Sequence, residues 1–255
     1  MIIMNGKIYY GNIIIANGRV IGIPCDLSGM KEFDEIQSES VDSIRRVTIN
    51  SDVNVKVSAC SSKNISAHLH GAAITDGDIA LSISRLGGEI RVWANLISND
   101  TSVINCIDSS SISIKNPILV DADVGLTLDV EIPIDFYGKL SIESENACVD
   151  VMSAVYAQDI KIEGKNGNIS LSASFQNLNI YCKNGNVDVD SDAKCDITLN
   201  ITCKNGNTNV AIGNLSKSDL VVNTENGRSK NTPLLGGKYT VSGFISCKNG
   251  NAKFR

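Results

Sequence analysis

Two histidines, His68 and His70, are the only imidazole side chains in this 255-residue chain. They flank Leu69, so on a β-strand both side chains point to the same face, a spacing that can place two imidazoles on one metal ion. Asp76 and Asp78 follow, but no third ligand stands in register with the pair. We therefore expect two surface histidines, with no metal site and no cofactor. Because no other histidine exists, Ser-His-Asp and Cys-His catalytic arrangements cannot be built elsewhere.

An acidic stretch is the next candidate for chemistry. It contains Asp121, Asp123, Asp129, Glu131 and Asp135. Paired carboxylates can bind calcium or catalyse glycoside hydrolysis. Here the acidic residues alternate with apolar ones, which predicts that they lie on the polar face of strands, where solvation alone accounts for them. We expect no catalytic residue and no enzymatic activity.

Eight cysteines are candidates for metal binding or disulfide formation. They are Cys25, Cys60, Cys106, Cys148, Cys182, Cys195, Cys203 and Cys247. No two form a CxxC pair, so the spacing excludes zinc-ribbon, iron–sulfur and thioredoxin-like motifs. We expect most of them to be reduced, small core residues. Cys182, Cys203 and Cys247 share one phase of a repeat, and stacking would bring Cys182 and Cys203 within disulfide range; whether they ever pair stays open.

That repeat dominates the last third of the chain. Its Asn-Gly pairs are Asn166-Gly167, Asn184-Gly185, Asn205-Gly206, Asn226-Gly227 and Asn249-Gly250. The asparagines follow one another at steps of 18, 21, 21 and 23 residues, and a near-constant step is the signature of stacked supersecondary units. Polar and apolar residues alternate on both sides of each pair, which predicts about two short strands in each unit.

Two topologies place Asn-Gly at a sharp turn, because both residues tolerate positive φ. An antiparallel meander would use each pair as a hairpin turn. A β-solenoid would use it as a corner and stack successive units about 4.8 Å apart. Small residues two positions before each Asn favour stacking of like on like, and the Asn amides could pair from unit to unit. We therefore predict an all-β solenoid of roughly 20-residue coils, with the meander as the alternative.

The chain before the repeats divides near residue 46. Residues 1–23 predict two or three strands with tight turns, a β-hairpin cap for one end of the stack. Residues 24–46 are polar and acidic, and we interpret them as a surface linker, so that 1–46 is one region and 47–255 the repeat domain. The last repeat has no polar capping unit, so Phe254 and Arg255 are expected at a self-association end, unless Phe254 folds back as a plug.

Charge and hydropathy exclude further functions. A net charge of −5 without a clustered basic stripe argues against nucleic-acid binding. Stacking would align Lys165, Lys183, Lys204 and Lys248 in one column, which we interpret as a solvated edge that deters aggregation. Secretory signals and apolar runs of about 18 residues are missing, so we expect no membrane span and a cytoplasmic location. A cell-surface location is the alternative if a leader is missing.

Several stretches outside the Asn-Gly units share a pattern with known proteins. They are residues 47–57 with alternating valines, a strand that ends at Pro133, and residues 140–151, which precede the Asn-Gly units. Together these resemble the bacterial "putative adhesin" β-solenoid family of unknown function, over about residues 47–255. The resemblance implies a right-handed, single-stranded β-helix-like fold and brings no catalytic residues with it.

These patterns predict a non-enzymatic structural or interaction protein. A rigid scaffold would form homo-oligomers or contact another protein through its ends and faces. The alternative is a carbohydrate-binding or carbohydrate-active β-helix. That alternative needs a column of exposed aromatic side chains, and the sequence offers a single tryptophan, Trp93, which alternates with Arg91 and would be either a ligand platform or a packing residue.

Overall fold

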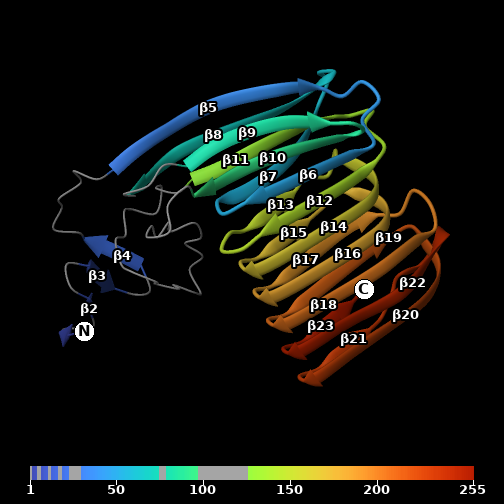
Figure 1. Ribbon diagram of the computed structural model, residues 1–255. Coiled ribbons are helices and arrows are strands. Elements are labelled where there is room, and N and C mark those ends of the chain that lie inside the picture. Colours follow the sequence, from blue (N-terminus) through green and yellow to red (C-terminus); the bar gives the residue numbers. More distant parts are fainter. Residues whose placement is uncertain are drawn as a thin grey trace.

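The computed structural model describes residues 2–4, 7–10, 13–16, 19–22, 30–74, 79–96 and 126–255. Over these ranges the protein consists of strands in three sheets and contains no helix (Figure 1). The described part accordingly offers no helix long and apolar enough to cross a membrane. The prediction of an all-β protein is confirmed. Asp76, Asp78, Asp121, Asp123, Cys25 and Cys106 lie outside the described residues.

Two mixed sheets build the body of the described chain. The nine-stranded sheet has the order β20 (Leu215–Asn226), β22 (Leu235–Asn249), β18 (Ile197–Asn205), β16 (Ser174–Asn184), β14 (Tyr156–Asn166), β12 (Lys139–Ser144), β6 (Arg46–Ser51), β10 (Glu89–Leu96) and β9 (Ile79–Leu86). The ten-stranded sheet has the order β21 (Ser229–Asn231), β23 (Ala252–Phe254), β19 (Thr208–Gly213), β17 (Val187–Asp192), β15 (Ile169–Leu171), β13 (Val149–Val151), β7 (Asn54–Cys60), β11 (Leu126–Pro133), β8 (Asn64–Ile74) and β5 (Met30–Ser40).

From β12 onward the chain alternates between the two sheets. In the nine-stranded sheet β12 pairs with β14, β14 with β16 and β16 with β18, all in parallel. The ten-stranded sheet repeats this order with β13, β15, β17 and β19. The Asn-Gly pairs lie where the chain leaves one sheet for the other, and Figure 1 shows the resulting ladder of strands. An antiparallel meander is excluded, because the strands that flank each Asn-Gly belong to different sheets.

The hydrophobic core lies between the two sheets and is itself a set of ladders. Strand β17 alternates strictly, with Val187 and Val189 fully buried. Ile160, Leu178 and Leu199 are register neighbours on three strands of the other sheet, and none of them is exposed. Burial of one such side chain stabilises the fold by roughly 1.5–3 kcal/mol. Apolar residues thus pack on apolar residues from β14 to β18, as period-two alternation in each unit requires, and Gly243 interrupts this row on β22.

The last unit of the chain does not lie at the end of the stack. Strand β22 pairs with β18 on one side and β20 on the other, and β23 lies between β19 and β21. The final unit is therefore inserted inside the unit that precedes it, and residues 215–231 form the outer edge. Phe254, which we expected at the free end, is fully buried between two neighbours. Arg255 donates its main-chain N–H to the carbonyl of Val210 at 2.9 Å.

The opposite end of the stack is antiparallel. Strand β8 joins β5 to β11, and β10 pairs with β9, all in antiparallel fashion. Strand β5 occupies part of the segment that we interpreted as a linker. That interpretation is wrong for residues 30–40, because β5 pairs with β8 along its whole length and Phe33 packs against the core.

A separate sheet precedes β5. It is a four-stranded antiparallel sheet of β1 (Ile2–Met4), β2 (Lys7–Tyr10), β3 (Ile13–Ala16) and β4 (Arg19–Gly22), where we expected two or three strands. Its role as a cap stays a prediction, as do the domain limits at residues 46 and 47.

Candidate functional site

Glycine is required at the corners by close approach of the backbones. Gly167, Gly185, Gly206 and Gly250 have φ values of 153°, 151°, 145° and 146°. A Cβ on Gly185 would lie 2.0 Å from the carbonyl oxygen of Gly167 in the preceding unit. Positive φ among the described corners is confined to glycine, so our expectation that the asparagines also use it is wrong. The asparagines have a different role.

The corner asparagines form two ladders, one from the residue before each corner Gly or Ala and one from the residue after it. In the first, each side-chain amide donates to the amide oxygen of the neighbouring unit over 2.6–2.9 Å, in the spatial order Asn146, Asn166, Asn184, Asn205, Asn249 and Asn226. In the second, the side-chain oxygens of Asn168, Asn186, Asn207 and Asn251 accept the main-chain N–H of the next unit over 2.9–3.0 Å. Both ladders use hydrogen-bonding capacity that a ligand would need, which gives these corners a structural role.

The three repeat cysteines form a ladder inside the core. Cys182, Cys203 and Cys247 are register neighbours on β16, β18 and β22, and all three are buried, free thiols. Cys247 also contacts the hydroxyl of Thr208 at 3.0 Å. Hydrogen bonding with Cys182 raises the pKa of Cys203 to about 11. Hydrogen bonding with Cys203, together with burial, raises the pKa of Cys247. The hydrogen bond with Cys203 lowers the pKa of Cys182. The raised pKa values make Cys203 and Cys247 poor nucleophiles, and all three buried cysteines serve as packing residues.

The repeat lysines lie along one side of the stack and are bracketed by carboxylates. Lys165 forms an ion pair with Glu145 at one end of the column, and Lys248 approaches Glu225 to 3.8 Å at the other. In between, the ammonium group of Lys204 lies 5.6 Å from the centre of the Tyr181 ring. These partly compensated charges are consistent with a solvated edge.

Amide side chains close both ends of the stack. At the β20–β21 end, Asn231 donates to the main-chain carbonyl of Leu220 at 2.8 Å. At the β5–β9 end, Gln37 donates to the carbonyl of Leu81 at 2.8 Å and accepts the N–H of Ile83 at 2.9 Å. Each contact joins the last strand of one sheet to the last strand of the other. The sequence led us to expect no polar capping unit at the C-terminal end; that expectation is wrong, because the outermost unit is not the last in sequence.

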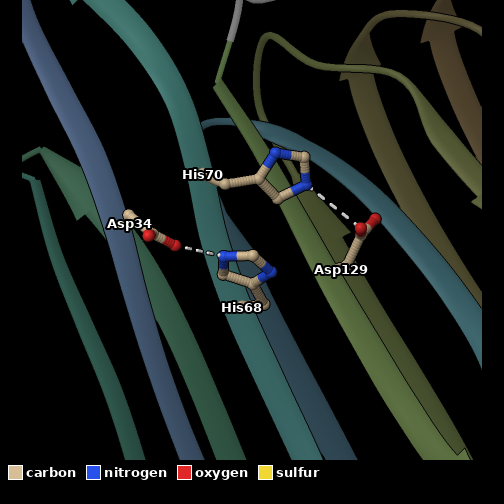
Figure 2. A network of polar contacts seen from close by, with 4 residues as sticks. All are labelled: Asp34, His68, His70 and Asp129. Carbon is tan, nitrogen blue, oxygen red and sulfur yellow. Dashed lines mark hydrogen bonds and ion pairs between the residues drawn. The ribbon is translucent and has the colours of Figure 1, made fainter.

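The two histidines form a crossed network with two aspartates on the outer face of the ten-stranded sheet (Figure 2). The Nε2 atom of His68 lies 2.7 Å from Asp34, and that of His70 lies 3.0 Å from Asp129. The ring centres are 4.7 Å apart. Glu131 is exposed, as is Asp135 beyond the end of β11. Within the described residues, no group of three or more His, Cys, Asp or Glu side chains is arranged to hold a metal ion.

A hollow on the outer face of the nine-stranded sheet is the best candidate for a binding site. It spans β6, β12, β14, β16 and β18 and has a volume of about 610 Å³. Its polar lining, which we call the polar hollow, consists of Arg46, Thr48, Lys139, Ser141, Glu143, Asp159, Lys161, Asn177, Asn179, Thr198 and Asn200. Every one of these side chains occupies an outward register position, so the hollow is a property of the stacked units and belongs to no single loop.

Ionisable groups with shifted pKa values gather on this face. The pKa of Asp159 is lowered, chiefly because Lys139 binds its carboxylate at 2.9 Å and Asn177 donates to it at 2.7 Å. At the rim of the polar hollow, the pKa of Glu89 is lowered most by its hydrogen bond from Thr48 and next by the one from Arg91. Perturbed ionisable groups within one concavity are typical of functional sites.

The pKa of a third group, Lys161, is raised, mainly by its hydrogen bond to Glu163 at 2.6 Å. This lysine lines the middle of the polar hollow. Lys139 and Lys161 are thus each held in a fixed pair with a carboxylate of this face, as a preorganised binding surface requires.

Two aromatic side chains flank the polar hollow. Trp93 on β10 and Tyr181 on β16 lie in one row, linked in register through Asn50, Glu143 and Glu163. Tyr181 is 36% exposed and Trp93 is half-buried. Trp93 is therefore an outward-facing residue of its strand, which was one of the two roles expected for it.

The sequence contains a signal for this hollow that we did not use. Lys161, Asn179 and Asn200 each lie five residues before the corner asparagine of their unit. Alignment of the units on those asparagines brings the three into one row. Arg46, by contrast, belongs to the irregular N-terminal part, where no Asn-Gly corner sets the register.

No protein-family model matches the chain, and no curated protein matches it. A similar solved structure is that of a "putative cell adhesion protein" from Clostridium sporogenes, with a TM-score of 0.51 and 11% identity over 88% of this chain and 99% of that one. A "putative adhesin" from Bacteroides fragilis (TM-score 0.34, 9% identity, 87% and 97% covered) and one from Parabacteroides merdae (0.36, 10%, 88% and 96%) score too low to carry an argument. The first likeness shows a shared fold.

Proposed function

We propose that this chain is a non-enzymatic adhesion module, a rigid β-solenoid that binds a partner through an outer sheet face. The observation that carries the proposal is the fixed register of outward side chains over successive units, in which Asn179 and Asn200 are neighbours on β16 and β18. A parallel stack held by core ladders and corner amides presents such rows without the entropy cost of ordering loops on binding.

The amide caps favour a separate partner over end-to-end self-assembly. Polar side chains at the terminal units of a repeat stack oppose addition of further units. Gln37 and Asn231 satisfy main-chain groups at the two ends, and the edge strands carry charges that disfavour pairing with another sheet. This proposal therefore does not include the self-association end that the sequence led us to expect at Phe254 and Arg255.

We place this module at the cell surface, the alternative to the cytoplasmic location expected from the sequence. Support comes from the fold shared with the solved "putative cell adhesion protein" from Clostridium sporogenes. The right-handed, single-stranded solenoid geometry implied by the family resemblance is part of the same proposal. A rod with capped ends and a hollowed face fits adhesion because multiple copies on one surface would bind with high avidity even when each contact is weak.

Adhesion itself can be measured with beads that carry the protein at a defined density. We expect the beads to remain bound under flow to at least one member of a panel of cultured bacterial and animal cells. An excess of the soluble protein should release them, because bead and soluble forms compete for the same receptors. Beads that are retained no better than albumin-coated beads on every cell type, or that soluble protein does not release, would contradict the proposal.

A further inference from the structure

The polar hollow is free of the negative excess that the whole chain carries. Arg46, Lys139 and Lys161 line it together with two carboxylates, those of Glu143 and Asp159. With the rim pair of Glu89 and Arg91 and with Glu163, the partner of Lys161, the charges of this face balance, whereas the whole chain has a net charge of −5. A cation without a fixed partner on such a face can bind an anion that the rest of the surface would repel.

Arg46 is the cation that remains available to such an anion. Both lysines of the hollow are ion-paired with carboxylates of the same face. Within the part of the chain that the structure describes, the guanidinium group of Arg46 has no ion pair and no hydrogen-bond acceptor. The nearby carboxylate of Glu89 is already held by Thr48 and Arg91. The planar fork of a guanidinium binds a carboxylate through two parallel hydrogen bonds.

Neutral hydrogen-bonding groups fill the rest of the hollow in rows. Asn179 and Asn200 are neighbours in one row and are joined by a hydrogen bond of 3.1 Å. Asn177 and Thr198 are neighbours in the adjacent row. The groups repeat at the inter-strand spacing of about 4.8 Å, which is close to the length of one pyranose unit in a linear glycan. Amides and hydroxyls can both donate to and accept from sugar hydroxyl groups.

The flanking aromatics extend this surface to the length of an oligosaccharide. Trp93 and Tyr181 are four strand steps apart in one row, or about 19 Å at the usual inter-strand spacing. The apolar faces of pyranose rings pack on aromatic rings. Trp93, on the strand next to β6, therefore offers a platform at one end of the hollow, and Tyr181 offers a second beside its β16 part. A protein partner fits less well, because protein interfaces are apolar at their centres. The side chains that project outward over the hollow are polar, and Leu140 and Ile160 line only its buried floor.

We propose that the polar hollow binds a linear acidic glycan, with Arg46 bound to the carboxylate of a uronic acid unit and the asparagines bound to neighbouring sugar hydroxyls. The inference rests on the proposed adhesion function and adds the class of ligand. Because successive units of the stack lie along the row, the glycan runs across the strands from Trp93 towards Tyr181.

The test uses three uronate hexasaccharides, from polygalacturonate, alginate and hyaluronan, each compared with the same oligosaccharide after its carboxylates have been reduced to hydroxymethyl groups. Titration calorimetry with the full chain should detect binding of at least one acidic form, about tenfold or more tighter than its reduced form. The difference should shrink as salt is added.

Two matched arginine variants locate the contact. Arg46→Gln removes the guanidinium in the hollow and should weaken binding of the acidic hexasaccharide about tenfold, down to the affinity of the reduced form. Arg228→Gln makes the same change in charge at the distant end of the stack, where the side chain is exposed, and should leave affinity within about twofold, since ordinary surface changes have small effects. Circular dichroism would verify that both variants are folded.

Three outcomes would overturn the inference. One is that none of the acidic hexasaccharides binds; another is that acidic and reduced forms bind equally; the third is that the two arginine variants weaken binding alike, which would indicate general charge attraction. If the cell adhesion of the beads persists in any of these cases, the proposed function stands and the proposed uronate contact at Arg46 fails. If adhesion is also absent, both proposals fail.

Discussion

Asn231 and Phe254 are register neighbours on β21 and β23, yet only the phenylalanine is fully buried. The position that points into the core of the stack changes from an apolar to a polar residue at the outermost unit. There the amide of Asn231 donates to the carbonyl of Leu220 and joins the two sheets across the open end. The chain thus places its capping unit second to last in sequence and last in space.

This cap predicts the oligomeric state. The intact chain should be a monomer of about 27 kDa by light scattering, and Asn231→Leu should form concentration-dependent oligomers, because it exposes an apolar end and leaves the Leu220 carbonyl without its donor. Asn223→Leu on the outward face of β20 is the control and should stay monomeric. Oligomers of the unmodified chain, or a monomeric Asn231→Leu variant, would show that the amide does not limit assembly.

Alanine variants of two glycines distinguish the destabilisation caused by steric clash from that caused by backbone strain. Gly185→Ala should lower the free energy of unfolding by at least about 3 kcal/mol, because its Cβ would overlap the carbonyl of Gly167 in addition to adopting a strained φ. Gly236 also has positive φ but no atom within 4 Å of the added Cβ, so Gly236→Ala should cost only about 1 kcal/mol. Urea denaturation of both variants provides the comparison, and equal losses would contradict the close contact between units.

The asparagine ladder predicts that the stability lost on replacing an asparagine depends on how many amide–amide hydrogen bonds it makes. Asn184 takes part in two amide–amide hydrogen bonds, whereas Asn226 at the outer edge takes part in one. Asn184→Ala should therefore destabilise the fold by about 2 kcal/mol and Asn226→Ala by about 1 kcal/mol, at about 1 kcal/mol for each hydrogen bond. Thermal unfolding measured by circular dichroism would rank the two variants, and a larger loss for Asn226→Ala would be inconsistent with an additive ladder.

The pairing of Asp159 predicts a pH dependence of stability. Its pKa lies below the ordinary value of 3.8, so the folded state binds this proton less readily than the unfolded state. The resulting stability is present above pH 3.8 and is lost as pH falls through the lowered pKa. Asp159→Asn should thus be less stable than the original chain near neutral pH, by about 1 kcal/mol. The difference in stability between Asp159→Asn and the original chain should disappear in strong acid. Denaturant titrations at a series of pH values measure this difference, and a difference that widens as the pH falls would contradict the prediction.

The repeats made the architecture predictable and the order of its last units unpredictable. Alternation of apolar residues around each Asn-Gly specifies strands and their buried faces, and small residues at a fixed phase indicate stacking. The alternation does not distinguish β20 from β22 as the outer strand, because both strands alternate similarly and end at an Asn-Gly pair. The corner after β20 does differ, since Arg228 stands where the units of β14, β16, β18 and β22 have a second asparagine. The deciding residue is Asn231, a single polar side chain at a core-facing position, and it is recognisable only when register is known.

The site was harder to infer for a related reason. Its side chains come from five strands that are separated by up to about 150 residues of sequence, and no local motif joins them. Sequence spacing did bring His68 and His70 to one face, as expected, but not their diagonal pairing with Asp34 and Asp129, which depends on the antiparallel neighbours of β8. Similarly, the capping role of Gln37 could not be inferred from sequence, because it depends on the position of β5 at the edge of the sheet.

The central claim is that the outer face of the nine-stranded sheet is the working surface, and two tryptophan variants test it most directly. Asn179→Trp places a bulky side chain in the polar hollow, and Asn209→Trp makes the same exchange at an exposed position on the outer face of the other sheet. We predict that beads carrying Asn179→Trp lose most of their retention on cells, whereas beads carrying Asn209→Trp keep it. Equal retention of the two, or a loss confined to Asn209→Trp, would contradict the account.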